Sequence, residues 1–276
     1  WSSAVCSSDL PDSGAVGVSL DDLDEALVTF SVPIDDDQLV PAKFILTREG
    51  EPLALRNGDP QTRDASGVYG LAPADGWQVG SSYTVQVSPA VTGPLGVSQP
   101  ISWHFQTAVP KVKSQTPDDG DNTVHIDDDQ LEVVFDNAID KAALLGGVRL
   151  LREGIEIDSS VPSSEESADS VIVTFAPLEG LQPGTSYQAI ISAAVGGPRA
   201  PGDFSWRFST AVPRMESVFP DSGATGISLD DLGEATVTFS VPIHVDQRIA
   251  DNFLLFRESD PVALRKGDPV SLGDSK

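Results

Sequence analysis

The chain has 276 residues, and its 42 acidic residues against 17 basic ones give a formal net charge of −25. Such a surface repels phosphate groups, so nucleic acids and anionic membranes are disfavoured as partners. No apolar run approaches the roughly 18–20 residues needed to span a bilayer, so no membrane insertion is expected in this fragment. The length predicts two or three domains, and the 24 glycines and 21 prolines favour many short strands and tight turns.

The first ten residues, WSSAVCSSDL, resemble the translated end of a common sequencing adapter, from which only Ala4 departs. We therefore expect residues 1–10 to be foreign to the protein and to stand where its first strand belongs. Cys6, the one cysteine, lies in this segment. Disulfides and thiol chemistry are therefore not expected in the native chain.

A repeat of about 105 residues runs through the rest of the chain. Residues 11–34 (PDSGAVGVSLDDLDEALVTFSVPI) return as residues 220–243 (PDSGATGISLDDLGEATVTFSVPI). A more divergent copy begins near Pro117, and the WxFxT motifs at residues 103–107 and 206–210 are both followed by Ala-Val-Pro. We therefore predict an artefactual segment and three units: residues 1–10, unit 1 (11–110), unit 2 (111–213) and a truncated unit 3 (214–276).

Within the units, apolar residues alternate with polar ones in short runs that are separated by Gly, Pro and Asp. Ala26, Val28 and Phe30 share one face of a run, and Trp103 and Phe105 share one face of another. This alternation is typical of half-buried antiparallel strands. About seven such runs per unit predict an all-β immunoglobulin-type β-sandwich. In unit 2 the expected strands lie near residues 112–116, 124–126, 131–136, 147–152, 170–176, 186–193 and 203–210.

The runs PDSGATGISLDD, LQPGTSYQAIIS and WRFST resemble the bacterial Ig-like domain found in tandem in S-layer and other large bacterial surface proteins. The resemblance covers residues 11–213 fully and residues 214–276 in part. It implies tandem Ig-like sandwiches that are extracellular or at the cell surface. It also implies a tyrosine corner at Tyr83 and Tyr187, whose hydroxyls would bond to nearby backbone. Unit 3 has no LxPGxxY or WxFxT motif, so we expect its apolar residues to lack cover.

Acidic clusters are the most chemically suggestive feature of the sequence. Carboxylates gathered in loops can supply the six to eight oxygen ligands that Ca²⁺ takes. Calcium is therefore the one possible cofactor, although no cluster fits the EF-hand loop pattern. The alternative interpretation is a set of solvated acidic loops that keep the protein soluble. The candidate calcium ligands are Asp35, Asp36, Asp37, Asp127, Asp128 and Asp129.

No catalytic motif stands out. The three histidines occupy non-equivalent places in their units, and the sequence contains no His-Glu-x-x-His pair, nucleophile elbow or phosphate-binding loop. Trp103 and Trp206 lie on the predicted core face of their strands. Trp77 is the better candidate for an exposed, sugar-stacking aromatic residue.

The sequence therefore predicts a non-catalytic structural spacer of a bacterial cell-surface or secreted protein, with adhesion as a further possible role. Its expected partners are neighbouring repeats of the same chain, and a cell-surface glycan or protein where it is adhesive. The short Pro-terminated links TAVP-K and TAVP-R predict units stacked end to end as a semi-rigid rod. Two alternatives stay open: a Ca²⁺-dependent glycan- or protein-binding module, and an accessory region of a large secreted hydrolase.

Overall fold

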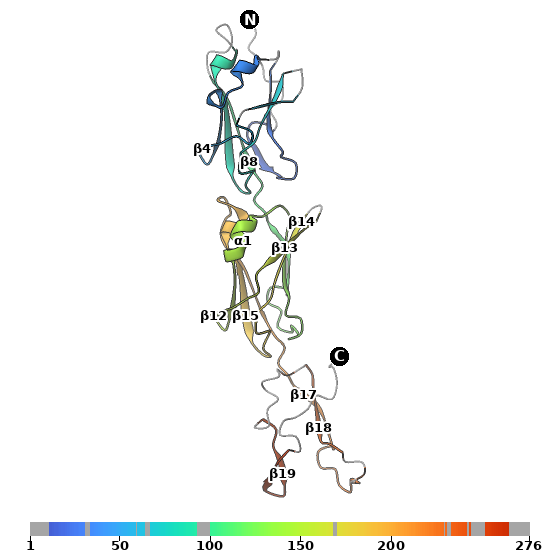
Figure 1. The fold of residues 1–276 in the computed structure, drawn as a ribbon. Coiled ribbons are helices and arrows are strands. Elements are labelled where there is room, and N and C mark those ends of the chain that lie inside the picture. Colours follow the sequence, from blue (N-terminus) through green and yellow to red (C-terminus); the bar gives the residue numbers. More distant parts are fainter. Residues whose placement is uncertain are drawn as a thin grey trace.

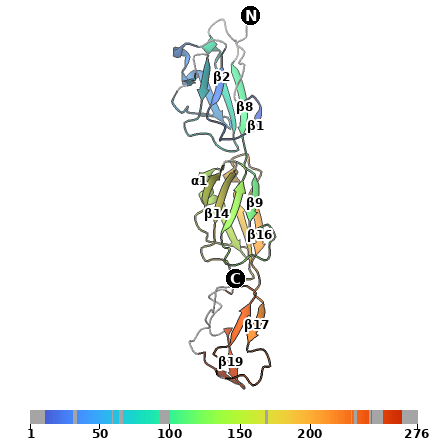
Figure 2. The ribbon, with the colours of Figure 1, turned by 90° about the vertical axis from the view of Figure 1, so that its right-hand side faces the viewer.

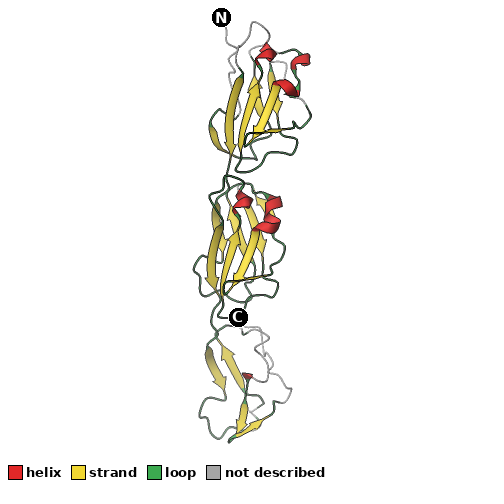
Figure 3. Cartoon of the chain, turned by 90° about the vertical axis from the view of Figure 1, so that its left-hand side faces the viewer, coloured by secondary structure: helices red, strands yellow, loops and turns green. Residues whose placement is uncertain are grey.

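The computed structural model describes residues 11–30, 34–58, 60–63, 67–92, 100–167, 170–228, 230, 233–241, 243 and 252–264. The three units follow one another along a single long axis (Figure 1), and a view at right angles shows the same line (Figure 2). Strands dominate, and the few short helices of units 1 and 2 lie at the end of each unit nearer the N-terminus of the chain (Figure 3). The protein is an all-β chain of tandem Ig-like β-sandwiches.

Unit 2 contains two four-stranded antiparallel sheets that face each other. One sheet has the order β13-β14-β10-β9 and the other the order β12-β11-β15-β16. The strands are β9 (Val112–Thr116), β10 (Leu131–Phe135), β11 (Val148–Arg152), β12 (Ile155–Ile157), β13 (Ser163–Ser167), β14 (Ser170–Phe175), β15 (Ser186–Ile191) and β16 (Phe204–Ser209). The helical turns are α1 (Lys141–Gly147) and η4 (Ala193–Gly196).

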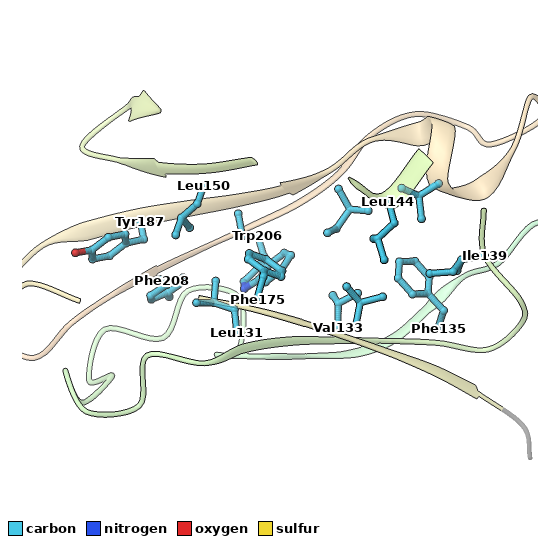
Figure 4. Close-up of a cluster of buried hydrophobic side chains, with 14 of the residues drawn as sticks. Leu131, Val133, Phe135, Ile139, Leu144, Leu150, Phe175, Tyr187, Trp206 and Phe208 are labelled. Atoms are coloured by element: carbon cyan, nitrogen blue, oxygen red, sulfur yellow. The ribbon is translucent and has the colours of Figure 1, made fainter. Parts of the chain in front are cut away.

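The core of unit 2 lies between these sheets (Figure 4). Along β10, Leu131, Val133 and Phe135 are buried and the residues between them are half-buried, as a period of two requires. Val133 pairs with Val173 of β14 in the same sheet. The opposite sheet contributes Trp206, which is 1% exposed. The alternation in the sequence therefore places large apolar side chains from both sheets in one continuous core.

Unit 1 has a similar sandwich, with one three-stranded sheet of order β2-β6-β5 and one five-stranded sheet of order β1-β8-β7-β3-β4. Strand β1 runs parallel to β8, whereas the other pairs are antiparallel. The strands are β1 (Ala15–Val18), β2 (Ala26–Thr29), β3 (Phe44–Arg48), β4 (Glu51–Leu53), β5 (Gln61–Thr62), β6 (Val68–Leu71), β7 (Ser82–Val87) and β8 (Ile101–Thr107). The helical turns are η1 (Asp36–Gln38), η2 (Pro41–Lys43) and η3 (Pro89–Thr92).

The core of unit 1 is built on the predicted faces. Ala26, Val28 and Phe30 are all buried, as are Trp103 and Phe105 on β8. The adapter-like residues 1–10, which were expected to replace a first strand, lie outside the described residues.

Unit 3 shows two separate two-stranded antiparallel sheets, β17-β18 and β19-β20. Large apolar side chains on these strands are exposed: Leu255 is 47% exposed and Phe256 is 54% exposed. Lone strand pairs leave such side chains without a facing layer. Among the described residues of unit 3, the strands are β17 (Met215–Phe219), β18 (Thr236–Phe239), β19 (Leu255–Arg257) and β20 (Asp260–Val262).

Candidate functional site: the junction between units 1 and 2

The candidate calcium ligands fall in two loops, one in each of the first two units. Asp35 and Asp37 are exposed, and Asp36 lies in η1. In unit 2, Asp127 and Asp128 are exposed, and the Asp127 carboxylate lies 3.3 Å from Nδ1 of His125. Within the described part of the chain, no three His, Cys, Asp or Glu side chains lie close enough together to hold a metal ion.

Two acids of the run before β2, Asp24 and Glu25, form ion pairs. The Asp24 carboxylate accepts a hydrogen bond from Arg56 at 2.9 Å, and this bond lowers the pKa of Asp24. The neighbouring Glu25 side chain, only 6% exposed, pairs with Arg63 and crosses Gly70, where a Cβ atom would collide with the carboxylate. Asp24 and Glu25 therefore link segments of unit 1 that are distant in sequence, whereas Asp21 and Asp22 of the same run are exposed.

The exposure of Trp77 is lower than the sequence predicted. Its ring is half-buried and packs edge-on against Tyr83, with ring centroids 4.8 Å apart. Its indole N–H donates to the backbone oxygen of Asp24 at 2.9 Å. Trp77 precedes Gln78 as buried Leu181 precedes Gln182 in unit 2, and it packs against the core of unit 1 as a partly buried residue.

Two clefts stand out on the described part of the chain. One, of about 440 Å³, lies on unit 1 between Pro41, Phe44, Pro52 and Leu55, and its lining residues include no acid, base or nucleophile. A second, of about 400 Å³, lies between units 1 and 2 and is lined by both units. Residues of both sandwiches therefore contribute to one surface at the junction.

The junction surface of unit 1 is a turn that two side chains hold in place. The backbone N–H of Gln78 donates to the Tyr83 hydroxyl at 2.8 Å, which is the tyrosine corner that the resemblance implied. Thr107, which is buried, accepts from the N–H of Ser81 at 2.9 Å and donates to the oxygen of Gln78 at 2.7 Å. Burial raises the pKa of the Tyr83 hydroxyl. The hydrogen bonds that hold this turn therefore all come from residues of unit 1.

Unit 2 repeats this arrangement at its own far end. The N–H of Gln182 donates to the Tyr187 hydroxyl at 2.8 Å, and burial likewise raises the pKa of Tyr187. The Thr210 hydroxyl accepts from the N–H of Thr185 at 3.0 Å and donates to the oxygen of Gln182. The predicted tyrosine corner is therefore present in both units.

At the junction, glycines let two backbones approach closely. Gly80, in the turn of unit 1, has a φ of +57°, and a Cβ atom there would lie 2.3 Å from the oxygen of Gly196 in unit 2. Gly197 has a φ of +84°, and a Cβ atom there would lie 2.1 Å from the oxygen of Val79. The N–H of Arg199 donates to the oxygen of Gly80 at 3.1 Å. Any side chain at either glycine would separate the units.

The connection itself is also tied down. Lys111, directly after the Pro110 that ends the link, donates its N–H to the Asp136 carboxylate at 2.7 Å, and the N–H of Asp136 donates to the oxygen of Lys111 at 2.9 Å. Arg214 and Ser240 form the matching pair at the start of unit 3, with the N–H of Arg214 donating to the Ser240 hydroxyl at 3.0 Å. Both links therefore enter the next unit in the same way.

Comparison with known proteins agrees with the fold. Residues 106–210 match the family model described as bacterial Ig-like domain. No curated protein matches the chain.

Among solved structures, the chain is similar to the crystal structure of Rst D1-D2, at 12% identity over 75% of this chain and 98% of that one, with a TM-score of 0.29. It is similar to the N-terminal part of the bacterial S-layer protein SbsC, at 16% identity over 67% of this chain and 41% of that one, with a TM-score of 0.25. It is also similar to the titin Ig tandem domains A164-A165, at 11% identity over 75% and 95%, with a TM-score of 0.27.

No helix in the described ranges is both long enough and apolar enough to cross a membrane.

Proposed function

We propose that the chain is a non-catalytic spacer of a bacterial cell-surface or secreted protein, which holds other parts of that protein away from the cell envelope. The observation that carries this proposal is the interlocked junction, in which the backbones of units 1 and 2 meet at Gly80 and Gly197. A tied link and a close backbone contact restrict bending between the units. Such a junction suits transmission of distance and orientation along the array.

Two further observations support the proposal. The buried polar residues of the two described cores are Ser81, Thr107 and Thr210. Their hydroxyls donate to backbone oxygens of the turns at Val79, Gln78 and Gln182. The family-model match to a bacterial Ig-like domain supports a place at the cell surface. Adhesion to a glycan or a protein would be an additional role of the same array.

Pulling the full chain by its ends in a single-molecule force experiment tests the mechanical role. Each sandwich should resist extension and then open in one step, because its strands are joined laterally by hydrogen bonds. A unit of about 100 residues at about 3.3–3.6 Å each should release about 300 Å of chain. Two such steps are expected from units 1 and 2. A smooth extension without steps would contradict the proposal.

A further inference from the structure

The far end of unit 2 carries the same docking surface as the far end of unit 1, but it is uncovered. Gly184, with a φ of +61°, is the counterpart of Gly80, and its N–H donates to the oxygen of Ala211 at 3.1 Å as the N–H of Gly80 donates to the oxygen of Ala108 at 2.9 Å. Gly80 is buried, whereas Gly184 is exposed. The two turns differ in what lies against them rather than in how they are built.

The apolar residue of each link shows the same contrast. Val109, in the link after unit 1, is half-buried, whereas its counterpart Val212 is 63% exposed. The part of unit 2 that covers the turn of unit 1 is the Gly-Gly-Pro loop, residues 196–198, which begins at the last residue of η4. Residues 214–276 include no such Gly-Gly-Pro sequence. The Gly184 turn therefore has the same hydrogen bonds as the Gly80 turn but is exposed. The Gly-Gly-Pro loop that covers the Gly80 turn shows which kind of segment would fit it.

We propose that the surface formed by Pro183, Gly184 and Val212 is a docking site for the Gly-Gly-Pro loop of a further complete copy of the unit. The loop would place its backbone against Gly184 as Gly196 and Gly197 do against Gly80. This inference deepens the proposed spacer function and rests on its end-to-end stacking. Docking would require glycine both at the turn and in the loop, because a Cβ atom on either backbone keeps the two backbones from coming into contact.

The matched variants are Gly184→Ala and Gly180→Ala. Both glycines have positive φ, +61° and +71°, so alanine strains the backbone at each by a similar amount. A Cβ atom at Gly180 meets nothing within 4 Å, and the atoms nearest to one at Gly184 belong to Val212, at an ordinary contact distance of 3.4 Å and beyond. Gly184→Ala should therefore differ from its control only when a loop is docked on the turn.

The test uses the full chain with one extra copy of residues 111–213 inserted after Pro213, so that a Gly-Gly-Pro loop follows unit 2. Spin labels at the exposed Ser205 and at its counterpart in the inserted copy report the distance across the new junction, with Cys6 replaced by serine. We expect a narrow distance distribution that Gly180→Ala preserves and Gly184→Ala abolishes. A broad distribution without any glycine substitution, or one that Gly184→Ala leaves narrow, would overturn the docking site.

The existing junction provides the positive control. With labels at the exposed His104 and Ser205, Gly80→Ala should abolish the narrow distribution across units 1 and 2, and Gly76→Ala should preserve it. Different results would refute the docking site and the spacer function. If the lengthened chain stays elongated in solution but its new junction is broad, the docking site is wrong and the spacer stands. If it collapses to a compact particle, both are wrong.

Discussion

The tyrosine corner is the best place to test the structure at atomic detail. In the Tyr187→Phe variant the ring remains, because it is 1% exposed and stacks on Phe208 at a centroid distance of 5.3 Å. Only the hydroxyl is lost, and with it the 2.8 Å partner of the part-buried Gln182 N–H. A lost hydrogen bond costs about 0.5–1.5 kcal/mol, and an N–H left unsatisfied costs about 1–3 kcal/mol. We expect unit 2 to lose about 1–2 kcal/mol of unfolding free energy.

Two measurements check this loss. The melting temperature of unit 2 should fall by about 4–8 °C for each kcal/mol, as for other domains of about 100 residues. Amide hydrogen exchange followed by NMR should show faster exchange at Gln182 but no change at Gln78. The Tyr83→Phe variant should show the reverse pattern, so each variant is the control for the other. Unchanged exchange at Gln182 in Tyr187→Phe would refute the corner as the anchor of the turn.

Three further predictions follow from burial and charge. Burial raises the pKa of Tyr83 and Tyr187 above the ordinary value of 10.0, so their contribution to stability is complete below about pH 10 and is lost as the pH rises through the folded-state pKa. Urea unfolding should therefore show a lower unfolding free energy at about pH 11 than at about pH 8. If the Tyr83→Phe/Tyr187→Phe double variant lost as much unfolding free energy between these pH values, the loss would not come from the two tyrosines. Leu150→Ala, at a residue that is 0% exposed, should cost about 2–5 kcal/mol, whereas Leu178→Ala, at one that is 66% exposed, should stay within about 0.5 kcal/mol; equal costs by chemical denaturation would contradict the assigned core. Millimolar Ca²⁺ should leave the melting temperature unchanged, because the described acids form no metal cluster, and a clear rise would favour the calcium-dependent binding module instead.

The strands that bury one face could be predicted from the sequence. The alternation at Leu131–Phe135 and at Phe204–Ser209 gives both the strand and its buried side, because a period of two leaves no other arrangement for the apolar residues. The polar edge strand Ser163–Ser167 was not predicted, since its sequence SSEES has no apolar alternation and its pairing with β14 defines it. Of the expected strand at residues 124–126, only a bridge between Val124 and Thr210 forms.

Helix α1 and the junction were also missed, for different reasons. The signal for α1 was present: Asp140 accepts from the N–H groups of Ala142 and Ala143 as an N-cap, ahead of Ala-Ala-Leu-Leu. The junction could not be found in this way. Gly80 and Gly197 each look like ordinary turn glycines, and only the folded units bring them together across more than one hundred residues. The acidic clusters were conspicuous in the sequence, but their described members bring no three metal-ligating side chains together.

Small-angle X-ray scattering of the full chain tests the end-to-end stacking most directly. Three units of about 35 Å each, from strands of about 3.3 Å per residue plus end loops, make a rod about 105 Å long with a radius of gyration of about 30 Å. A compact chain of 276 residues would give about 19 Å. The stacked arrangement predicts the larger value and the scattering profile of a rod, and a globular profile with the smaller value would contradict it.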